Sequence, residues 1–121
     1  MQYSTTVLEH FARPRNAGQL PSANAQGQAG IPGQGNYMVF FLRIEDDRVA
    51  EASFETFGCP GSIASGSILT ELVTGSSLEE ALSMDPQVIL TALGGLPPGR
   101  EQCADLAVAA LRKALDDYAS P

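Results

Sequence analysis

The sequence predicts an α+β fold in which a small antiparallel β-sheet packs against several helices and the chain ends in a long helix. Two neighbouring segments rich in aromatic and β-branched residues predict a β-hairpin. Helical apolar patterns follow the hairpin, and the longest lies at the C-terminal end. With 121 residues, 44% of them apolar, the chain is predicted to form one domain over residues 1–121, which needs neither a disulfide nor a metal ion to fold.

The N-terminal part predicts a short helix followed by a long irregular segment. The helix is expected over residues 3–11, with Ser4 or Thr5 as its N-cap. Its apolar residues, expected on one face, are Val7, Leu8 and Phe11. Residues 13–36 are rich in Gly, Pro, Gln, Asn and Ala and almost free of charge, which is typical of a functional or mobile loop.

The hairpin is predicted from two strands and a short turn. Tyr37–Glu45 reads YMVFFLRIE, a dense run of aromatic and β-branched residues. Arg48–Phe57 alternates polar and apolar residues, as a half-buried strand does. Asp46 and Asp47 lie between them and form the expected turn.

Three helices are predicted between the hairpin and the C-terminal helix. The first covers residues 63–74 and ends at Gly75. Its expected buried face consists of Ile63, Ile68, Leu69, Leu72 and Val73. Residues 77–80 have the pattern of a capping box and open a short second helix, and Asp85-Pro86 opens a third, which ends at Gly94-Gly95.

The C-terminal helix is predicted from Glu101 onward, because apolar residues recur there at helical spacing. These are Cys103, Leu106, Ala107, Ala110, Leu111, Ala114, Leu115 and Tyr118.

The charge balance excludes several classes of partner. The chain has 14 acidic and 7 basic residues and a formal net charge of −7, which opposes binding to nucleic acid or to an anionic membrane. It shows neither an apolar run long enough to span a bilayer nor the pattern of a signal peptide. We therefore expect a cytoplasmic protein that binds neither nucleic acid nor membranes.

Two cysteines are the candidate functional residues. Cys59 lies in the turn that enters one predicted helix, and Cys103 lies in the first turn of the last helix. Free backbone N–H groups at a helix start stabilise a thiolate, the form that binds metal or attacks sulfur. In a reducing cytosol such cysteines are free thiols or metal ligands rather than a structural disulfide. The structural alternative is two buried thiols, and Cys103 is in register with the apolar stripe.

Three groups of motifs carry a family resemblance. The N-terminal group is VLEHF at residues 7–11 and PRNAG at 14–18. The central group is FETFGC at residues 54–59 and SIASGS at 62–67, and the C-terminal group is Leu96-Pro97-Pro98 and Gln102-Cys103. In this order and spacing they resemble the scaffold family of iron–sulfur cluster assembly, which includes IscU and the N-terminal part of NifU.

The resemblance implies a fold and a function. The implied fold is an antiparallel sheet of about three strands covered by helices, with ligands gathered from three loops at one end. In the implied function a cysteine desulfurase delivers persulfide sulfur to loop cysteines, iron joins, and a [2Fe–2S] cluster is assembled and passed to apo acceptor proteins. Such a scaffold is not an enzyme in the sense of turnover.

The ligand positions depart from the family pattern. Where the family has Cys-Gly-Asp in the first ligand loop, this chain has Gln34-Gly35-Asn36, and where the family has His-Cys it has Gln102-Cys103. Cys59 matches the remaining family cysteine. The resemblance thus implies that Cys59 and Cys103 bind the cofactor or metal, while Gln34, Asn36 and Gln102 line the same site as neutral, much poorer ligands.

Three hypotheses follow for this degenerate site. In the first, Cys59 and Cys103 of two subunits hold a [2Fe–2S] cluster, iron or zinc in a homodimer. In the second, the ligand loss is complete, and the domain is a metal-free module that binds the desulfurase or another assembly partner as a regulator. In the third, one of the two cysteines accepts persulfide sulfur without building a cluster.

Two further features are given lesser roles. His10 matches a family position that is not a ligand, so we expect a structural or surface histidine. Leu96-Pro97-Pro98 matches the start of the family's LPPVK chaperone-recognition segment, but Gly99-Arg100 replaces Val-Lys, which argues against chaperone contact through this loop.

Overall fold

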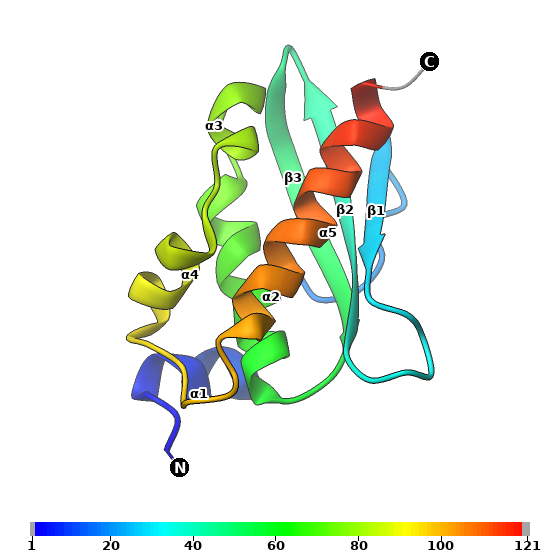
Figure 1. Cartoon of the computed structure of the whole chain (residues 1–121). Coiled ribbons are helices and arrows are strands. Elements are labelled where there is room, and N and C mark those ends of the chain that lie inside the picture. The colour runs from blue at the N-terminus through cyan, green and yellow to red at the C-terminus, as the bar shows by residue number, and fades with distance from the viewer. Residues whose placement is uncertain (1, 120–121) are drawn as a thin grey trace.

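The computed structural model describes residues 2–119 and confirms the α+β prediction (Figure 1). A three-stranded antiparallel sheet has the strand order β1-β2-β3. The strands are β1 (Ala25–Ala29), β2 (Tyr37–Glu45) and β3 (Arg48–Phe57). The helices are α1 (Thr5–Ala12), α2 (Pro60–Val73), α3 (Leu78–Leu82), α4 (Pro86–Leu93) and α5 (Gln102–Ala119).

The predicted hairpin is confirmed at the bounds that the sequence indicated. Glu45 of β2 pairs with Arg48 of β3, so the turn consists of two residues. Those residues, Asp46 and Asp47, both have positive φ angles, 51° and 58°. A turn with positive φ at both central residues matches the twist of paired strands, and Asp tolerates this conformation better than most residues.

Strand β1 lies within the segment that we expected to be irregular, so the prediction for residues 13–36 is wrong in its middle part. The sequence AQGQA has low strand propensity, but its small residues point to the core and its glutamines point outward. Helix α5 packs directly on this strand: a Cβ at Gly27 would lie 2.2 Å from the Ala114 backbone nitrogen. Tertiary packing against α5 therefore overrides local propensity here.

Helices α2 and α5 cover one face of the sheet, with α2 on β3 and α5 on β1 and β2 (Figure 1). The other helices lie outside this layer: α1 packs on α2, α4 contacts α2 and α5, and α3 contacts α5 and β3. The core between sheet and helices contains large side chains of the hairpin, chiefly Met38, Phe40, Leu42 and Phe54.

Helix α2 differs from the prediction in its start and in its buried face. It begins at Pro60, three residues earlier than expected, and most of its buried residues are small. A Cβ at Gly66 would lie 2.5 Å from the Phe54 ring, which explains why only a small residue fits. Of the expected face, Leu69 and Val73 are fully buried, whereas Ile63, Ile68 and Leu72 are half-buried.

Helix α1 presents a different face to the core than its apolar spacing indicates. Val7 is fully buried, but Leu8 and Phe11 are 49% and 42% exposed. The second buried residue is His10, whose Nδ1 lies 2.7 Å from the Ser67 hydroxyl of α2. His10 thus has a structural contact, as expected, and its burial lowers the pKa of the imidazole.

The segment between α1 and β1 covers part of an open edge of the sheet. The Gly18 N–H donates to the Phe54 carbonyl, and the Phe54 N–H donates to the Asn16 carbonyl, so this connection covers part of the outer edge of β3. Asn24 then bonds through its side chain to both backbone groups of Ile44. A strand edge covered in this way is not free to pair with another chain.

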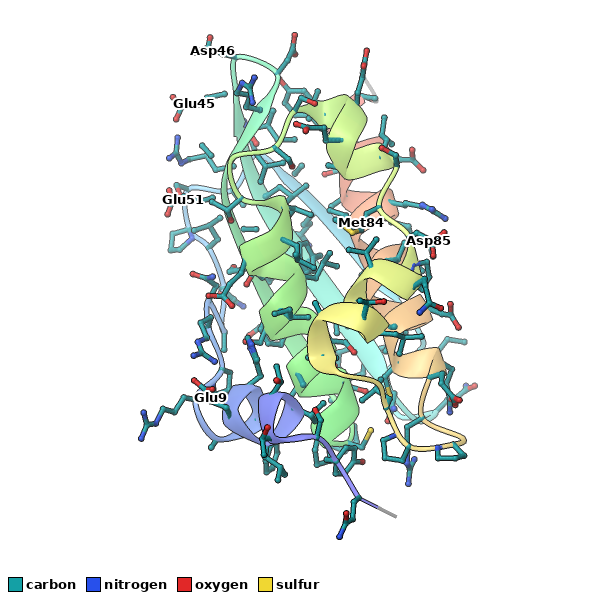
Figure 2. All side chains as sticks on the ribbon, turned by 90° about the vertical axis from the view of Figure 1, so that its left-hand side faces the viewer. Glu9, Glu45, Asp46, Glu51, Met84 and Asp85 are labelled. Atoms are coloured by element: carbon teal, nitrogen blue, oxygen red, sulfur yellow. The ribbon has the colours of Figure 1, made fainter. Side chains whose placement is uncertain are left out.

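The outer surface carries the negative charge. Figure 2 shows the acidic side chains of Glu9, Glu45, Asp46, Glu51 and Asp85 directed outward on the side that it presents. In residues 2–119, none of the helices has the length and apolar character needed to cross a membrane.

Candidate functional site

The two cysteines, 44 positions apart in sequence, lie next to each other at the end of the molecule where α2 and α5 begin (Figure 1). Cys59 is the N-cap residue of α2, and Cys103 is the second residue of α5. Their Sγ atoms are 3.5 Å apart, and both are free thiols. Cys59 is half-buried, whereas Cys103 is only 1% exposed.

Two glycines make room for this thiol pair. A Cβ at Gly61 would lie 3.3 Å from the Sγ of Cys103 and 3.5 Å from that of Cys59. A Cβ at Gly58 would lie 2.7 Å from the Ser62 hydroxyl and 2.9 Å from the Asn36 side chain. The GCPG turn therefore lets the thiols and the polar groups around them approach the backbone closely.

Ser62 connects the thiols to the loop between β1 and β2. Its hydroxyl donates to the Cys103 Sγ at 3.4 Å and accepts a hydrogen bond from the Asn36 Nδ2 at 3.1 Å. The Cys59 Sγ lies 3.9 Å from the same hydroxyl. Asn36 thus belongs to the site through Ser62, a buried residue that the sequence analysis did not single out. Its signals in the sequence are its place three residues after Cys59 and its position at the start of the SIASGS motif.

The pKa values of the two thiols are shifted in opposite directions. Burial acts to raise the pKa of Cys59, but hydrogen bonds with the Ser62 backbone N–H, Cys103, the Ser62 hydroxyl and the Gly61 N–H together bring it below the ordinary value. Burial dominates for Cys103 and, with the neighbouring Cys59, raises its pKa to about 11. Cys59 is therefore the stronger nucleophile of the pair at neutral pH.

Three further side chains surround the pair. Burial and the adjacent Cys59 thiol raise the pKa of the Tyr3 phenol, which hydrogen-bonds with that thiol, and the Arg100 guanidinium acts on Tyr3 and Cys103 in the opposite direction. The Leu96 side chain forms an apolar wall, because its Cδ2 would lie 3.5 Å from a Cβ at Gly61. The sequence predicts Tyr3 only as the start of the first helix and not as a residue of this site.

The two remaining predicted positions, Gln102 and Gln34, are placed differently relative to the thiol pair. Gln102 precedes Cys103 and lines, together with Asn36 and Cys103, a 500 Å³ hollow between β1 and α5. Gln34 lies two residues before Asn36, exposed, and its backbone N–H donates to the Ile31 carbonyl within the loop. The loops thus converge as predicted, through Asn36, whereas Gln34 bonds within its own loop.

The donor set does not fit a complete cluster or zinc site within one subunit. Such sites need four good ligands, and amide oxygens are poor ligands for iron and zinc. Within residues 2–119, no third His, Cys, Asp or Glu side chain joins the thiol pair to form a metal-binding group. The chemistry that this site itself supports is that of two adjacent thiols.

Comparison with known proteins gives close relatives in sequence. The profile of the NifU-like N terminal domain matches residues 2–121. The chain is 40% identical over 116 residues to the iron–sulfur cluster assembly scaffold protein IscU 1 of Archaeoglobus fulgidus, covering 96% of this chain and 76% of the relative. It is 38% identical over 122 residues to the scaffold protein IscU of Haemophilus influenzae, covering 98% of this chain and 96% of the relative.

A solved structure shows the same fold. The N-terminal part of a nitrogen-fixing NifU-like protein from Brucella abortus superimposes with a TM-score of 0.75 at 19% identity, covering 96% of this chain and 93% of that one. Together with the sequence matches, this agrees with the motifs at Pro14, Cys59 and Cys103. The chain belongs to the NifU-like N terminal domain family, which it shares with the IscU-type scaffold proteins of iron–sulfur cluster assembly.

Proposed function

We propose that this scaffold-like protein of iron–sulfur cluster assembly takes up persulfide sulfur on Cys59, with Cys103 as the second thiol of the site. The observation that carries the proposal is the pair of Sγ atoms 3.5 Å apart, one half-buried and one fully buried. A thiol at a helix N-terminus that receives several hydrogen bonds is well suited to attack an incoming persulfide.

The incomplete ligand set supports sulfur uptake over assembly of a whole cluster on one subunit. Gln34, Asn36 and Gln102 offer only neutral amides where the family pattern has a thiolate, a carboxylate and an imidazole. Sulfur transfer needs no more than one reactive thiolate, and the chain retains it. Iron or zinc, where bound, is therefore cargo that a second copy or a partner protein must help to hold.

The implied partners follow from this chemistry. A cysteine desulfurase supplies the persulfide, and apo iron–sulfur proteins or another scaffold are the acceptors. The two free thiols support a reducing compartment such as the cytoplasm. In this role the protein is a carrier rather than an enzyme.

The test is incubation with a cysteine desulfurase and its substrate cysteine, followed by intact-mass and peptide mass spectrometry. We expect one added sulfur atom on Cys59, best seen in a Cys103→Ser variant that lacks the second thiol. No added sulfur in either protein, while the desulfurase itself is loaded, would overturn the proposal. Cys59→Ser is the matched control and must remain unmodified.

The competing hypotheses give different results with the same protein. We would measure iron, zinc, acid-labile sulfide and native mass after purification without oxygen. One cluster or one zinc per two chains, lost in both cysteine variants, would identify a shared metal site in a homodimer instead. Desulfurase binding that persists in Cys59→Ser/Cys103→Ser, together with no sulfur transfer to the unsubstituted chain, would identify a regulatory binding module instead.

A further inference from the structure

We propose that Cys103 resolves the persulfide formed on Cys59, releasing hydrosulfide and closing a Cys59–Cys103 disulfide. The inference rests on the proposed function in one point, namely that Cys59 carries the persulfide. It adds an activity: the domain would convert bound sulfur into free sulfide with its own thiols as the source of electrons.

The distance between the thiols allows this reaction. A disulfide has an S–S length of about 2.05 Å, so sulfur atoms that are 3.5 Å apart need to approach by roughly 1.5 Å. Gly61 has no side chain to separate them, and a Cβ at this position would come within 3.3 Å of the Cys103 Sγ. Cys59 is half-buried, so its side chain has more freedom to move toward its partner than the buried Cys103 has.

The burial of the two thiols defines the side from which Cys103 attacks and the side toward which the outer sulfur leaves. Cys103 is 1% exposed and lies on the protein side of Cys59, where the Ser62 hydroxyl holds its Sγ at 3.4 Å. Thiol–disulfide exchange proceeds by attack along the line of the bond that breaks. Attack from the buried side therefore expels the outer sulfur toward the exposed side of Cys59, from which it leaves the site.

The reaction balances without another reactant. The outer sulfur of the deprotonated persulfide takes up the proton of Cys103 as the Cys103 Sγ attacks the Cys59 Sγ; the new bond joins the two Sγ atoms, and the bond to the outer sulfur breaks. The outer sulfur leaves with the electron pair of that bond as hydrosulfide, so it is reduced by two electrons. The two cysteines are together oxidised to the disulfide, and the proton of Cys103 leaves with the outer sulfur as part of the hydrosulfide.

The two thiols are in direct contact, so the exchange can follow as soon as the persulfide forms. Leu96 and Ser62 surround the thiols, and within residues 2–119 no third metal-binding side chain is close enough to hold them apart through a shared ion. Another round needs a dithiol reductant to reopen the disulfide. A single round needs none, which makes the reaction measurable in isolation.

The experiment follows sulfide and disulfide in the same reaction. The full-length chain is mixed without oxygen or reductant with a stoichiometric amount of persulfidated cysteine desulfurase, and in a second arm with glutathione persulfide. Hydrosulfide is measured by a colorimetric assay, and the Cys59–Cys103 linkage is measured by peptide mapping without reduction. We expect one hydrosulfide and one disulfide for each persulfide transferred.

Two variants of the buried thiol separate chemistry from folding. Cys103→Ser and Cys103→Ala are both expected to keep the added sulfur on Cys59 and to lose hydrosulfide release. Ser65→Ala, a change at a buried residue of the same helix, is the matched control and is expected to behave as the unsubstituted chain does. Circular dichroism confirms that each variant is folded before it is compared.

The outcomes distinguish the inference from the proposed function. A persulfide that survives as long in the unsubstituted chain as in Cys103→Ser would overturn the inference and leave sulfur uptake intact. Disulfide without matching hydrosulfide would overturn it too, because simple oxidation gives that result. No sulfur on Cys59 with either donor would overturn the proposed function, whereas reaction with glutathione persulfide alone would support the dithiol chemistry and remove the desulfurase as partner.

Discussion

Cys59 and Cys103 are the same chemical group in two different environments. Hydrogen bonds at the start of α2 lower the pKa of Cys59 against the effect of its burial, whereas burial raises the pKa of Cys103 to about 11. A thiolate forms only above the pKa of its thiol, and the thiolate is the reactive species. Burial and backbone hydrogen bonds, rather than residue type, thus decide which thiol accepts the sulfur and which resolves the persulfide.

This asymmetry predicts how the two thiols react with iodoacetamide as the pH changes. Alkylation of Cys59 is expected to reach half its maximal rate below pH 9.0, the ordinary pKa of a thiol, and that of Cys103 near pH 11. Peptide mass spectrometry over a pH series measures both rates in one sample. In denaturant the two profiles should coincide, and coincident profiles in the folded protein would contradict the prediction.

Ser62→Ala is predicted to lower the stability of the protein and the reactivity of Cys59 more than the same change at Ser65, one turn along α2. Ser62→Ala leaves the Asn36 side-chain amide without its acceptor and removes the donor to the Cys103 Sγ, so we expect a loss of roughly 1–3 kcal/mol in unfolding free energy. It also removes a hydrogen bond that lowers the pKa of Cys59, so alkylation of Cys59 at neutral pH should slow.

The matched control for this prediction is Ser65→Ala. Both serines are fully buried in α2, but in the part of the chain that the structure describes the Ser65 hydroxyl has no hydrogen-bond partner. Its loss should therefore cost little. Equal changes in urea midpoint and in Cys59 reactivity for the two variants would show that Ser62 has no special role.

At the scale of elements, the contact between β1 and α5 is the least expected feature of the fold. The strand sequence AQGQA carries no large apolar residue, yet its buried residues face α5 directly. The absence of side-chain bulk is what allows the helix backbone to approach. This contact also positions Cys103. Cys103 is the second residue of α5, and the contact with β1 fixes the path of that helix.

Gly27→Ala is expected to destabilise the protein by about 1–3 kcal/mol through overpacking. The added methyl group would meet backbone atoms of α5, at 2.2 Å from the Ala114 nitrogen and 2.7 Å from the Ala110 carbonyl oxygen, and backbone atoms cannot rotate away. Urea unfolding measures the change. Gln28→Ala, on the exposed face of the same strand, is the control, and equal midpoints for the two variants would refute close packing.

At the scale of the whole molecule, the site exists only because three distant segments meet. Asn36 comes from the loop before β2, Cys59 from the turn before α2 and Gln102-Cys103 from the start of α5. The elements that carry them are all packed in one core. The fold of the family thus brings these positions together whatever side chains they carry.

Restoring the family's residue types is predicted to restore metal binding. We expect Gln34→Cys/Asn36→Asp/Gln102→His to retain zinc through gel filtration at up to one ion per chain, and more than the unsubstituted chain retains. Bound metal should raise the Tm, because it stabilises only the folded state. Metal analysis and calorimetry measure both effects.

The control for this variant adds Cys59→Ser to the three substitutions. It removes a thiolate from the restored set and should abolish the gain in zinc. Failure of the first variant to bind zinc, despite native circular dichroism, would show that Gln34 does not reach the thiol pair.

Sequence patterns determined the elements whose signals are local. The hairpin with its Asp46-Asp47 turn, the capping box at Ser77 and the long C-terminal helix follow from residue preferences within a few positions, and the structure confirms them. The placement of both cysteines at helix starts followed in the same way. The resemblance of the motifs to the family also predicted that the loops carrying them converge.

Tertiary structure decided what depends on contacts between distant segments. Strand β1 forms because α5 covers it, and α2 buries small residues because the Phe54 ring lies against Gly66. His10 and not Leu8 faces the core because Ser67 offers it a hydrogen bond. The distance of 3.5 Å between two thiols 44 positions apart, and their opposite pKa shifts, follow from burial and packing, which no local pattern specifies.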